Sequence, residues 1–267
     1  MLVPIKPYLK LLSLLLITNL THAQYLNNNK FNSMVNGVLP PQTVFHYDFE
    51  NDDTENYYLG SVFGQNGWDS MSSYAATRIS DEYSSHGFQH LRISKDGNLP
   101  VNTIIGVISP DLANLPNKAL IGDETLVSAD ILISNKSITD YSILGYSTTQ
   151  NEGAWQIIFG YNGTIIISDD RNNDNTIVLY NTWIPWQIND YFNLKVKTSV
   201  SGDYIKYYID DVLIYTSRNG LIGATTVEQI KFFCNNFPDD NEYASLDNLT
   251  IDTSTLFGDL IFENGFE

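Results

Sequence analysis

Short runs of alternating apolar and polar side chains recur along most of the chain, and they constrain its fold more than any other feature. In the first run, residues 45–49, three aromatic residues alternate with two polar ones. This is the two-residue period of a strand with one buried face. Turn formers such as Asn162-Gly163 separate the runs, and no segment has the period of a long amphipathic helix. The sequence therefore predicts an all-β chain, a two-sheet antiparallel β-sandwich of the jelly-roll type.

Further strands are expected at short spacing. They cover residues 89–94, 125–134, 142–147, 155–161, 164–168, 176–180, 192–199, 204–215, 229–234 and 245–252. Asn162-Gly163 can supply the positive φ angles of a tight hairpin turn, and Asp210-Asp211 marks another turn. These local signals indicate hairpins rather than parallel crossovers.

The N-terminus has the features of an export signal. Lys6 and Lys10 precede an apolar run over residues 11–17, and Ala23 is a small residue suited to signal peptidase. The run is too short to span a bilayer, so no membrane insertion is expected. The mature protein should be secreted or extracytoplasmic, in the periplasm or at the cell surface. The expected organisation is a signal peptide removed on export over 1–23, a flexible leader over 24–42, the sandwich over 43–252, and a C-terminal tail over 253–267.

The chain is strongly acidic, because 14 Lys and Arg residues stand against 31 Asp and Glu residues, for a net charge of −17. Loss of Lys6 and Lys10 with the signal peptide changes this charge to −19. Such a surface repels phosphate groups, which argues against nucleic acid and anionic membrane surfaces as partners. Cys234 is the single cysteine, so an intrachain disulfide and a multi-cysteine metal site are excluded.

Several short motifs follow one another in a recognisable order. They are Tyr47-Asp48-Phe49-Glu50, Gly67-Trp68, Gly87-Phe88-Gln89-His90-Leu91-Arg92-Ile93, Tyr191-Phe192-Asn193-Leu194-Lys195-Val196, Tyr207-Tyr208-Ile209-Asp210-Asp211 and Leu246-Asp247-Asn248-Leu249. Their order and spacing resemble the concanavalin A-like lectin/glucanase superfamily, in its laminin-G-like bacterial branch, over roughly residues 43–252. The opening and closing motifs also resemble carbohydrate-binding jelly rolls with a structural calcium. The resemblance implies a sandwich and leaves the function open, because lectins, glycosidases, lyases and adhesion modules share this fold.

One acidic segment matches a catalytic spacing. Glu50, Asp52 and Glu55 form the E-x-D-x-x-E pattern of laminarinase-type glucanases. That pattern functions on a strand, where alternation directs the carboxylates into one cleft. Here the intervening residues, beginning with Asn51, are loop formers without an apolar face. The sequence also lacks a Gly-x-Ser-x-Gly elbow, a His-Glu-x-x-His helix and a phosphate-binding loop, so we assign no catalytic residues.

A structural calcium site is the metal chemistry that the resemblance implies. If the first and last strands pair, Asp48 and Glu50 come close to Asp247 and Asn248, and these four side chains offer the oxygen ligands that Ca²⁺ prefers. A second interpretation stays open, in which Asp48 and Asp247 only cap strand ends by hydrogen bonds.

Aromatic side chains are abundant, with 17 Tyr, 13 Phe and 4 Trp. Sugar rings pack their C–H faces on such rings. The candidate ligand-binding residues are Trp68, which follows Gly67, and Tyr180, Trp183 and Trp186, which lie in a loop-like connection beside Pro185. The alternative is that these rings belong to the core, and at least two of the four Trp residues are expected there.

These features together predict an exported noncatalytic glycan-binding or adhesion module with a structural calcium. Its partner would be a polysaccharide or a cell-surface glycan. The alternative is a carbohydrate-active enzyme, a glycoside hydrolase or polysaccharide lyase, on the same fold. A third interpretation is a structural surface protein that uses the fold for protein contacts. The sequence leaves the oligomeric state open.

Overall fold

The computed structural model describes eight segments of the chain. They are residues 42–51, 56–112, 124–134, 139–170, 176–199, 204–221, 226–237 and 242–254. The predicted signal peptide, almost all of the predicted leader and most of the predicted tail lie outside these segments.

The described residues form sixteen strands. They are β1 (Gln42–Tyr47), β2 (Gly60–Ser61), β3 (Asp69–Met71), β4 (Thr77–Ser80), β5 (His90–Ser94), β6 (Ile104–Ile108), β7 (Glu124–Ile133), β8 (Tyr141–Ser147), β9 (Glu152–Phe159), β10 (Thr164–Asp169), β11 (Val178–Pro185), β12 (Phe192–Ser199), β13 (Ile205–Ile209), β14 (Val212–Ser217), β15 (Gln229–Asn235) and β16 (Tyr243–Ser254). No helix in the described segments is long and apolar enough to cross a membrane.

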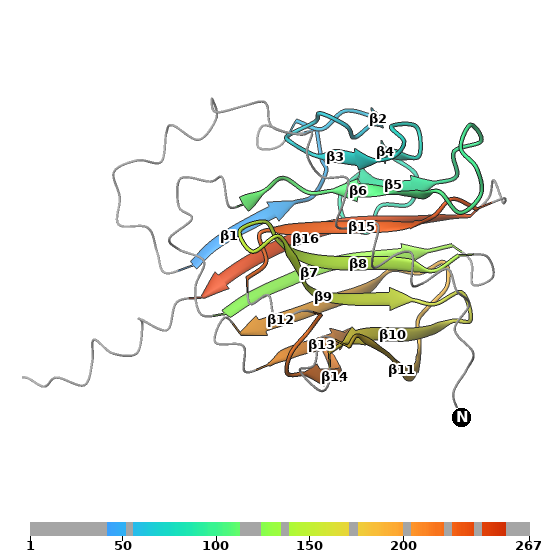
Figure 1. Ribbon diagram of the computed structural model, residues 1–267. Coiled ribbons are helices and arrows are strands. Elements are labelled where there is room, and N and C mark those ends of the chain that lie inside the picture. The colour runs from blue at the N-terminus through green and yellow to red at the C-terminus, as the bar shows by residue number, and fades with distance from the viewer. Residues whose placement is uncertain are drawn as a thin grey trace, which may run out of the picture. The chain divides into compact units, whose positions relative to one another are not determined.

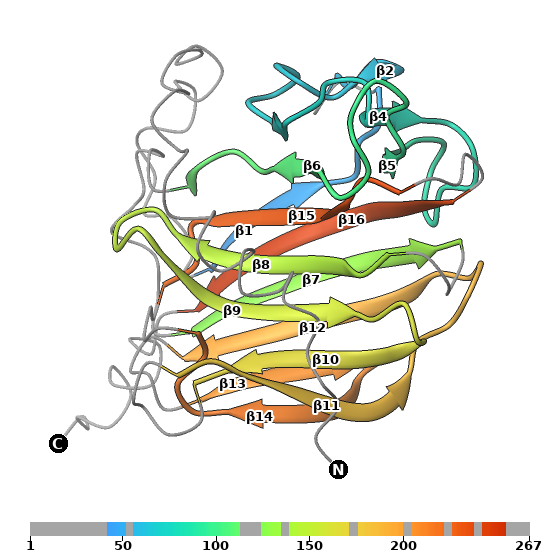
Figure 2. The same cartoon turned by 45° about the vertical axis from the view of Figure 1, so that its right-hand side comes forward.

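The strands form two sheets that face each other (Figures 1 and 2). One sheet has nine strands in the order β14-β13-β12-β7-β16-β5-β4-β2, with β1 also paired to β16. The other has seven strands in the order β11-β10-β9-β8-β15-β6-β3. Every strand pair among the described residues is antiparallel. The prediction of a two-sheet antiparallel sandwich is confirmed.

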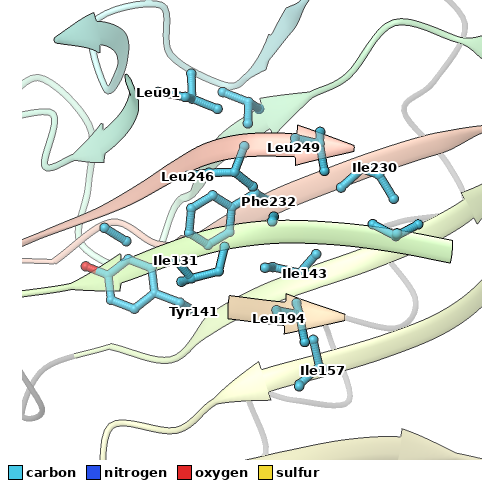
Figure 3. Packing of buried hydrophobic residues seen from close by; sticks show 14 of the residues in the cluster. Leu91, Ile131, Tyr141, Ile143, Ile157, Leu194, Ile230, Phe232, Leu246 and Leu249 are labelled. Carbon is cyan, nitrogen blue, oxygen red and sulfur yellow. The ribbon is translucent and has the colours of Figure 1, made fainter. Parts of the chain in front are cut away.

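The core lies between the sheets and follows from the alternation in sequence. In β12, Phe192, Leu194 and Val196 are buried, whereas the side chains between them are half-exposed. Figure 3 shows Leu194 of this sheet close to Ile143 and Ile157 of the other. Each such side chain contributes roughly 1.5–3 kcal/mol when it is fully buried, so the period-2 pattern is itself the main source of stability.

The first and last strands of the sandwich are neighbours. β1 pairs with the second half of β16, from Gln42 opposite Ser254 to Tyr47 opposite Leu249. β5 pairs with the first half of β16, where Leu246 lies opposite Leu91. The pairing that the resemblance implied is therefore present, and it brings residues 46–50 close to residues 247–249.

The structure differs from the sequence-based strand assignment at the sheet edges and at the strands next to two of those edges. Residues 183–186 were expected in a loop, but β11 continues to Pro185. Proline has no N–H to donate and is tolerated in an edge strand, and β11 is the edge of the seven-stranded sheet. The strands β2, β3, β4 and β6 were not predicted. They have two to five residues, which is too short for a clear periodic signal.

Candidate functional site

Trp183 occupies an irregular position in the edge strand β11. Thr164 of β10 pairs with Pro185, and Ile166 pairs with Asn181, so the two strands shift register between these pairs. Within the bulge, the Trp183 N–H donates a hydrogen bond of 2.8 Å to Asn181 Oδ1. The Thr182 hydroxyl donates to the Ile165 carbonyl at 2.8 Å. These bonds fix the backbone on both sides of the tryptophan.

The bulge presents the Trp183 ring to solvent. The residue has a φ of 61°, a left-handed conformation that is unusual for a bulky side chain and costs on the order of 1–3 kcal/mol. Its side chain is 75% exposed, although an indole ring is among the side chains that gain most from burial. Local strain and an exposed indole at one residue mark a candidate binding position.

Trp186 anchors the end of the bulge. It is buried, and its indole N–H donates to the Gly160 carbonyl at 3.2 Å. Its backbone N–H donates to the Gly163 carbonyl at 3.2 Å. The structure places this predicted ligand-binding residue in the core, where it joins β11 to the turn between β9 and β10.

Tyr180 closes the side of the sandwich. It pairs with Ile167, whose side chain lies in the core, and opposite residues of an antiparallel pair share a face. Its ring lies 4.8 Å, centroid to centroid, from the ring of Tyr215 in β14 of the other sheet. The Tyr215 hydroxyl donates to Asp169 Oδ2 at 2.7 Å. Tyr180 therefore stays partly exposed but is turned toward the opposing sheet.

Trp68 belongs to the core. Its ring centroid lies 5.3 Å from that of Phe49 and 5.6 Å from that of Tyr47, and only 2% of the residue is exposed. The Gly67 turn, with a φ of 86°, leads the chain back over the first strand. Of the four predicted ligand-binding aromatics, the structure exposes most of Trp183 and part of Tyr180.

The four predicted calcium ligands lie where the two ends of the sandwich meet, but two of their carboxylates, those of Glu50 and Asp247, bind one loop. Glu50 Oε1 accepts the N–H groups of Phe88 at 2.6 Å and Gln89 at 2.8 Å. Asp247 Oδ2 accepts the N–H groups of Ser85 at 2.8 Å and His86 at 3.1 Å. It also accepts the Ser85 hydroxyl at 2.9 Å. We call residues 84–89, between β4 and β5, the clamped loop.

The remaining two predicted ligands also have hydrogen-bond partners. Asp48 Oδ1 accepts the Glu50 N–H at 3.1 Å, and Asn248 Oδ1 lies 2.6 Å from His46 Nε2. Burial raises the pKa of Asp247, and the hydrogen bonds from His86 and Ser85 oppose that rise. No group of three or more His, Cys, Asp or Glu residues in the described segments is arranged to hold a metal. The calcium site stays a prediction.

Asp52 and Glu55, the other acids of the catalytic-like spacing, lie outside the described residues. Glu50 lies beyond the end of β1 at Tyr47, so it does not belong to a regular strand.

Tyr161 is an exposed aromatic residue that sequence reasoning missed. It lies in the turn before Thr164, at the same end of the β10–β11 pair as Trp183. Its N–H donates to Asp140 Oδ1 at 2.7 Å, and burial raises the pKa of that carboxyl. The predicted Asn162-Gly163 turn was a sufficient signal, because a residue beside a hairpin tip is usually exposed.

No protein-family model matches the chain, and no curated protein matches it by sequence. Several solved structures are similar to the chain. A sialidase is similar with a TM-score of 0.53 and 12% identity, over 78% of this chain and 18% of the sialidase. The binding domain of botulinum neurotoxin DC in complex with SialylT has a TM-score of 0.46 and 16% identity, over 71% of this chain and 43% of that one. An endo-β-1,4-glucuronan lyase from the fungus Trichoderma reesei has a TM-score of 0.48 and 10% identity, over 79% and 95%.

The protein thus spans less than half of the sialidase and toxin chains that it matches. The sialidase similarity supports the same fold class that the strand order defines. At this level of identity it shows the fold alone.

Proposed function

We propose that this protein is an exported, noncatalytic glycan-binding module of the concanavalin A-like type, with the Trp183 ring as its main ligand contact. The observation that carries the proposal is the exposure of this ring, 75%, on a strained bulge held by hydrogen bonds. A flat indole face suits the C–H face of a pyranose, and a fixed backbone lowers the entropy cost of binding.

The charge of the protein narrows the ligand class. A net charge of −17 repels acidic polymers, most strongly at low salt. A neutral polysaccharide or neutral cell-surface glycan avoids that repulsion. A sialidase is among the similar structures named above, which agrees with glycans as the general class of partner.

The test is affinity electrophoresis of the mature protein in gels that contain laminarin, xylan, galactomannan or hydroxyethyl cellulose. At least one neutral polysaccharide should retard the protein, and Trp183→Ala should weaken binding about tenfold or more, which corresponds to ~1.4 kcal/mol. Phe88→Ala is the matched control, because this ring is 81% exposed on the clamped loop, away from β11. Unchanged retardation of Trp183→Ala would refute the assignment of the site.

The same polysaccharides should be assayed for new reducing ends and for unsaturated products. Binding without turnover supports a binding module. Turnover would instead support the alternative function, a hydrolase or lyase on this fold.

A further inference from the structure

A second exposed aromatic surface lies at the other side of the sandwich. Phe63 follows β2, and Tyr74 lies between β3 and β4. Their rings are stacked, with centroids 4.0 Å apart and planes at 30°. Even in this pair Phe63 is 46% and Tyr74 is 56% exposed. Two large rings that stack on each other and still face solvent indicate a contact surface.

The backbone under this pair is held by a dense set of hydrogen bonds. The Gln65 side chain accepts the Tyr58 N–H at 2.8 Å and donates to the carbonyls of Tyr58 at 2.9 Å and Ser61 at 2.7 Å. The Gly64 N–H donates to the Trp68 carbonyl at 2.9 Å. These bonds hold the turn that carries Phe63.

The segment that carries Tyr74 is fixed in the same way. The Ser73 hydroxyl oxygen accepts the N–H groups of Ala75 at 3.1 Å and Ala76 at 3.2 Å. The preceding residue, Ser72, has a φ of 58°, as strained for a non-glycine residue as Trp183. The ring pair is therefore preorganised before any ligand arrives.

The sheet order separates this pair from Trp183. β2 and β3 are the edges of the two sheets on one side, and β11 and β14 are the edges on the other. Figures 1 and 2 show β2 and β11 at opposite ends of the stack of strands. Six inter-strand spacings separate β3 from β11, which is about 29 Å at ~4.8 Å each. A short saccharide cannot contact both surfaces.

We propose that the Phe63–Tyr74 pair is a second glycan-binding site, for neutral polysaccharide, so that one protein molecule binds polysaccharide on two opposite sides. This rests on the proposed function. The same two arguments select the ligand: ring faces suit pyranose C–H faces, and the net charge of −17 disfavours acidic polymers. Because the two sites lie at opposite edges of the sheets, the protein can link two polysaccharide chains.

The test uses cellohexaose, laminarihexaose, mannohexaose and xylohexaose in isothermal titration calorimetry against the full mature protein. We expect two binding sites per chain for at least one of them. Trp183→Ala should reduce the number to one, and the double variant Phe63→Leu and Tyr74→Leu should also reduce it to one. Leucine keeps the surface apolar while it removes the ring faces, and Phe88→Ala should retain two sites.

Polymer binding supplies the second readout. The wild-type protein should raise the turbidity of a solution of the matching polysaccharide, because it links chains. Either variant with one site should still bind the polymer but should no longer raise the turbidity. Its affinity for the polymer, measured from the retardation in affinity gels, should fall by at least tenfold.

The outcomes separate the two proposals. One site that is abolished by Trp183→Ala and unaffected by the double variant overturns the second site and leaves the proposed function standing. Absence of binding to any hexasaccharide or polysaccharide overturns both. Near-ultraviolet circular dichroism and the melting temperature of each variant establish that a lost site is not a lost fold.

Discussion

Lys231 offers a test of the physical reasoning that is independent of any ligand. It lies in β15 and is fully buried. Its Nζ is 3.2 Å from the centroid of the Tyr146 ring, and it has no hydrogen-bond partner in the described part of the chain. Burial therefore lowers the pKa of Lys231 to about 8.

The size of the effect follows from linkage between protonation and folding. A fall of the lysine pKa from 10.5 to about 8 corresponds to about 3 kcal/mol of unfavourable free energy for the charged form. Below pH 8 Lys231 is protonated in both the folded and the unfolded state, so the folded state carries the whole free-energy cost of the buried charge. Between pH 8 and 10.5 only the unfolded state keeps the proton, and stability should rise with pH. Above pH 10.5 Lys231 is neutral in both states, and the cost of the buried charge is absent.

Lys231→Met should remove the charge while it keeps an unbranched side chain of similar size. We expect the free energy of unfolding at pH 7 to increase by about 1–3 kcal/mol, less than the full cost because the cation also gains from the Tyr146 ring. Urea denaturation of both proteins from pH 7 to 10.5 measures the difference, which should shrink toward zero at the upper end.

Lys206→Met is the matched control. The Lys206 Nζ also lies over a tyrosine ring, 4.4 Å from the centroid of Tyr204, but this lysine is half-exposed. Its replacement should change stability by no more than about 0.5 kcal/mol at any pH in the range. A difference between wild type and Lys231→Met that does not vary with pH would refute the reasoning.

Three further predictions concern buried groups, and a fourth concerns calcium. Burial, reinforced by the nearby Arg92, lowers the pKa of His90 to about 4. Protonation therefore opposes folding between pH 6.5 and 4, and His90→Leu should abolish about 3 kcal/mol of acid destabilisation in urea titrations. Asp247→Ala should lower the free energy of unfolding by about 2–4 kcal/mol in the same assay, because three hydrogen bonds to the clamped loop are lost. EDTA should lower the melting temperature of the wild type if calcium is bound, and an unchanged melting temperature would contradict the calcium prediction. Gly106→Ala should cost about 1–3 kcal/mol by thermal unfolding, since its Cβ would lie 2.4 Å from the Phe232 carbonyl oxygen, whereas Gly97→Ala, which meets nothing within 4 Å, should be nearly neutral.

The fold was predictable because its signal is local and repeated. Alternation along segments such as 192–199 is a direct consequence of one buried face, and it identifies strands without knowledge of their partners. The strands that the sequence did not predict are short, and they include the interior strands β4 and β6 as well as the edge strands β2 and β3. β2 and β3 are two and three residues long, and Pro185 suggested a break where an edge strand tolerates proline.

The candidate site was predictable only in part. Trp68 and Trp183 have the same side chain, and their different exposure is decided by strand pairing that the sequence does not display. Trp68 packs on Phe49, 19 positions earlier, whereas the bulge between β10 and β11 turns Trp183 outward. The Phe63–Tyr74 stack joins two irregular segments that have no period.

The sequence also did not reveal the hydrogen-bond partners of the acidic residues. The bond from Ser85 to Asp247 joins residues 162 positions apart, and that from Phe88 to Glu50 joins residues 38 apart. The resemblance suggested that these oxygens were available for a metal, whereas backbone N–H groups of the clamped loop bind two of them, Glu50 Oε1 and Asp247 Oδ2.

The position of β16 has a consequence for how the molecule is made. This strand is flanked by β7 and β5 and supplies the partner of β1. Until residues 243–254 leave the ribosome, β7 is paired only with β12, β5 is paired only with β4, and β1 has no partner strand. The nine-stranded sheet is therefore completed late, when β16 joins a β14-β13-β12-β7 part to a β5-β4-β2 part. A chain interrupted before Tyr243 would expose unpaired edges of β7, β5 and β1 to aggregation.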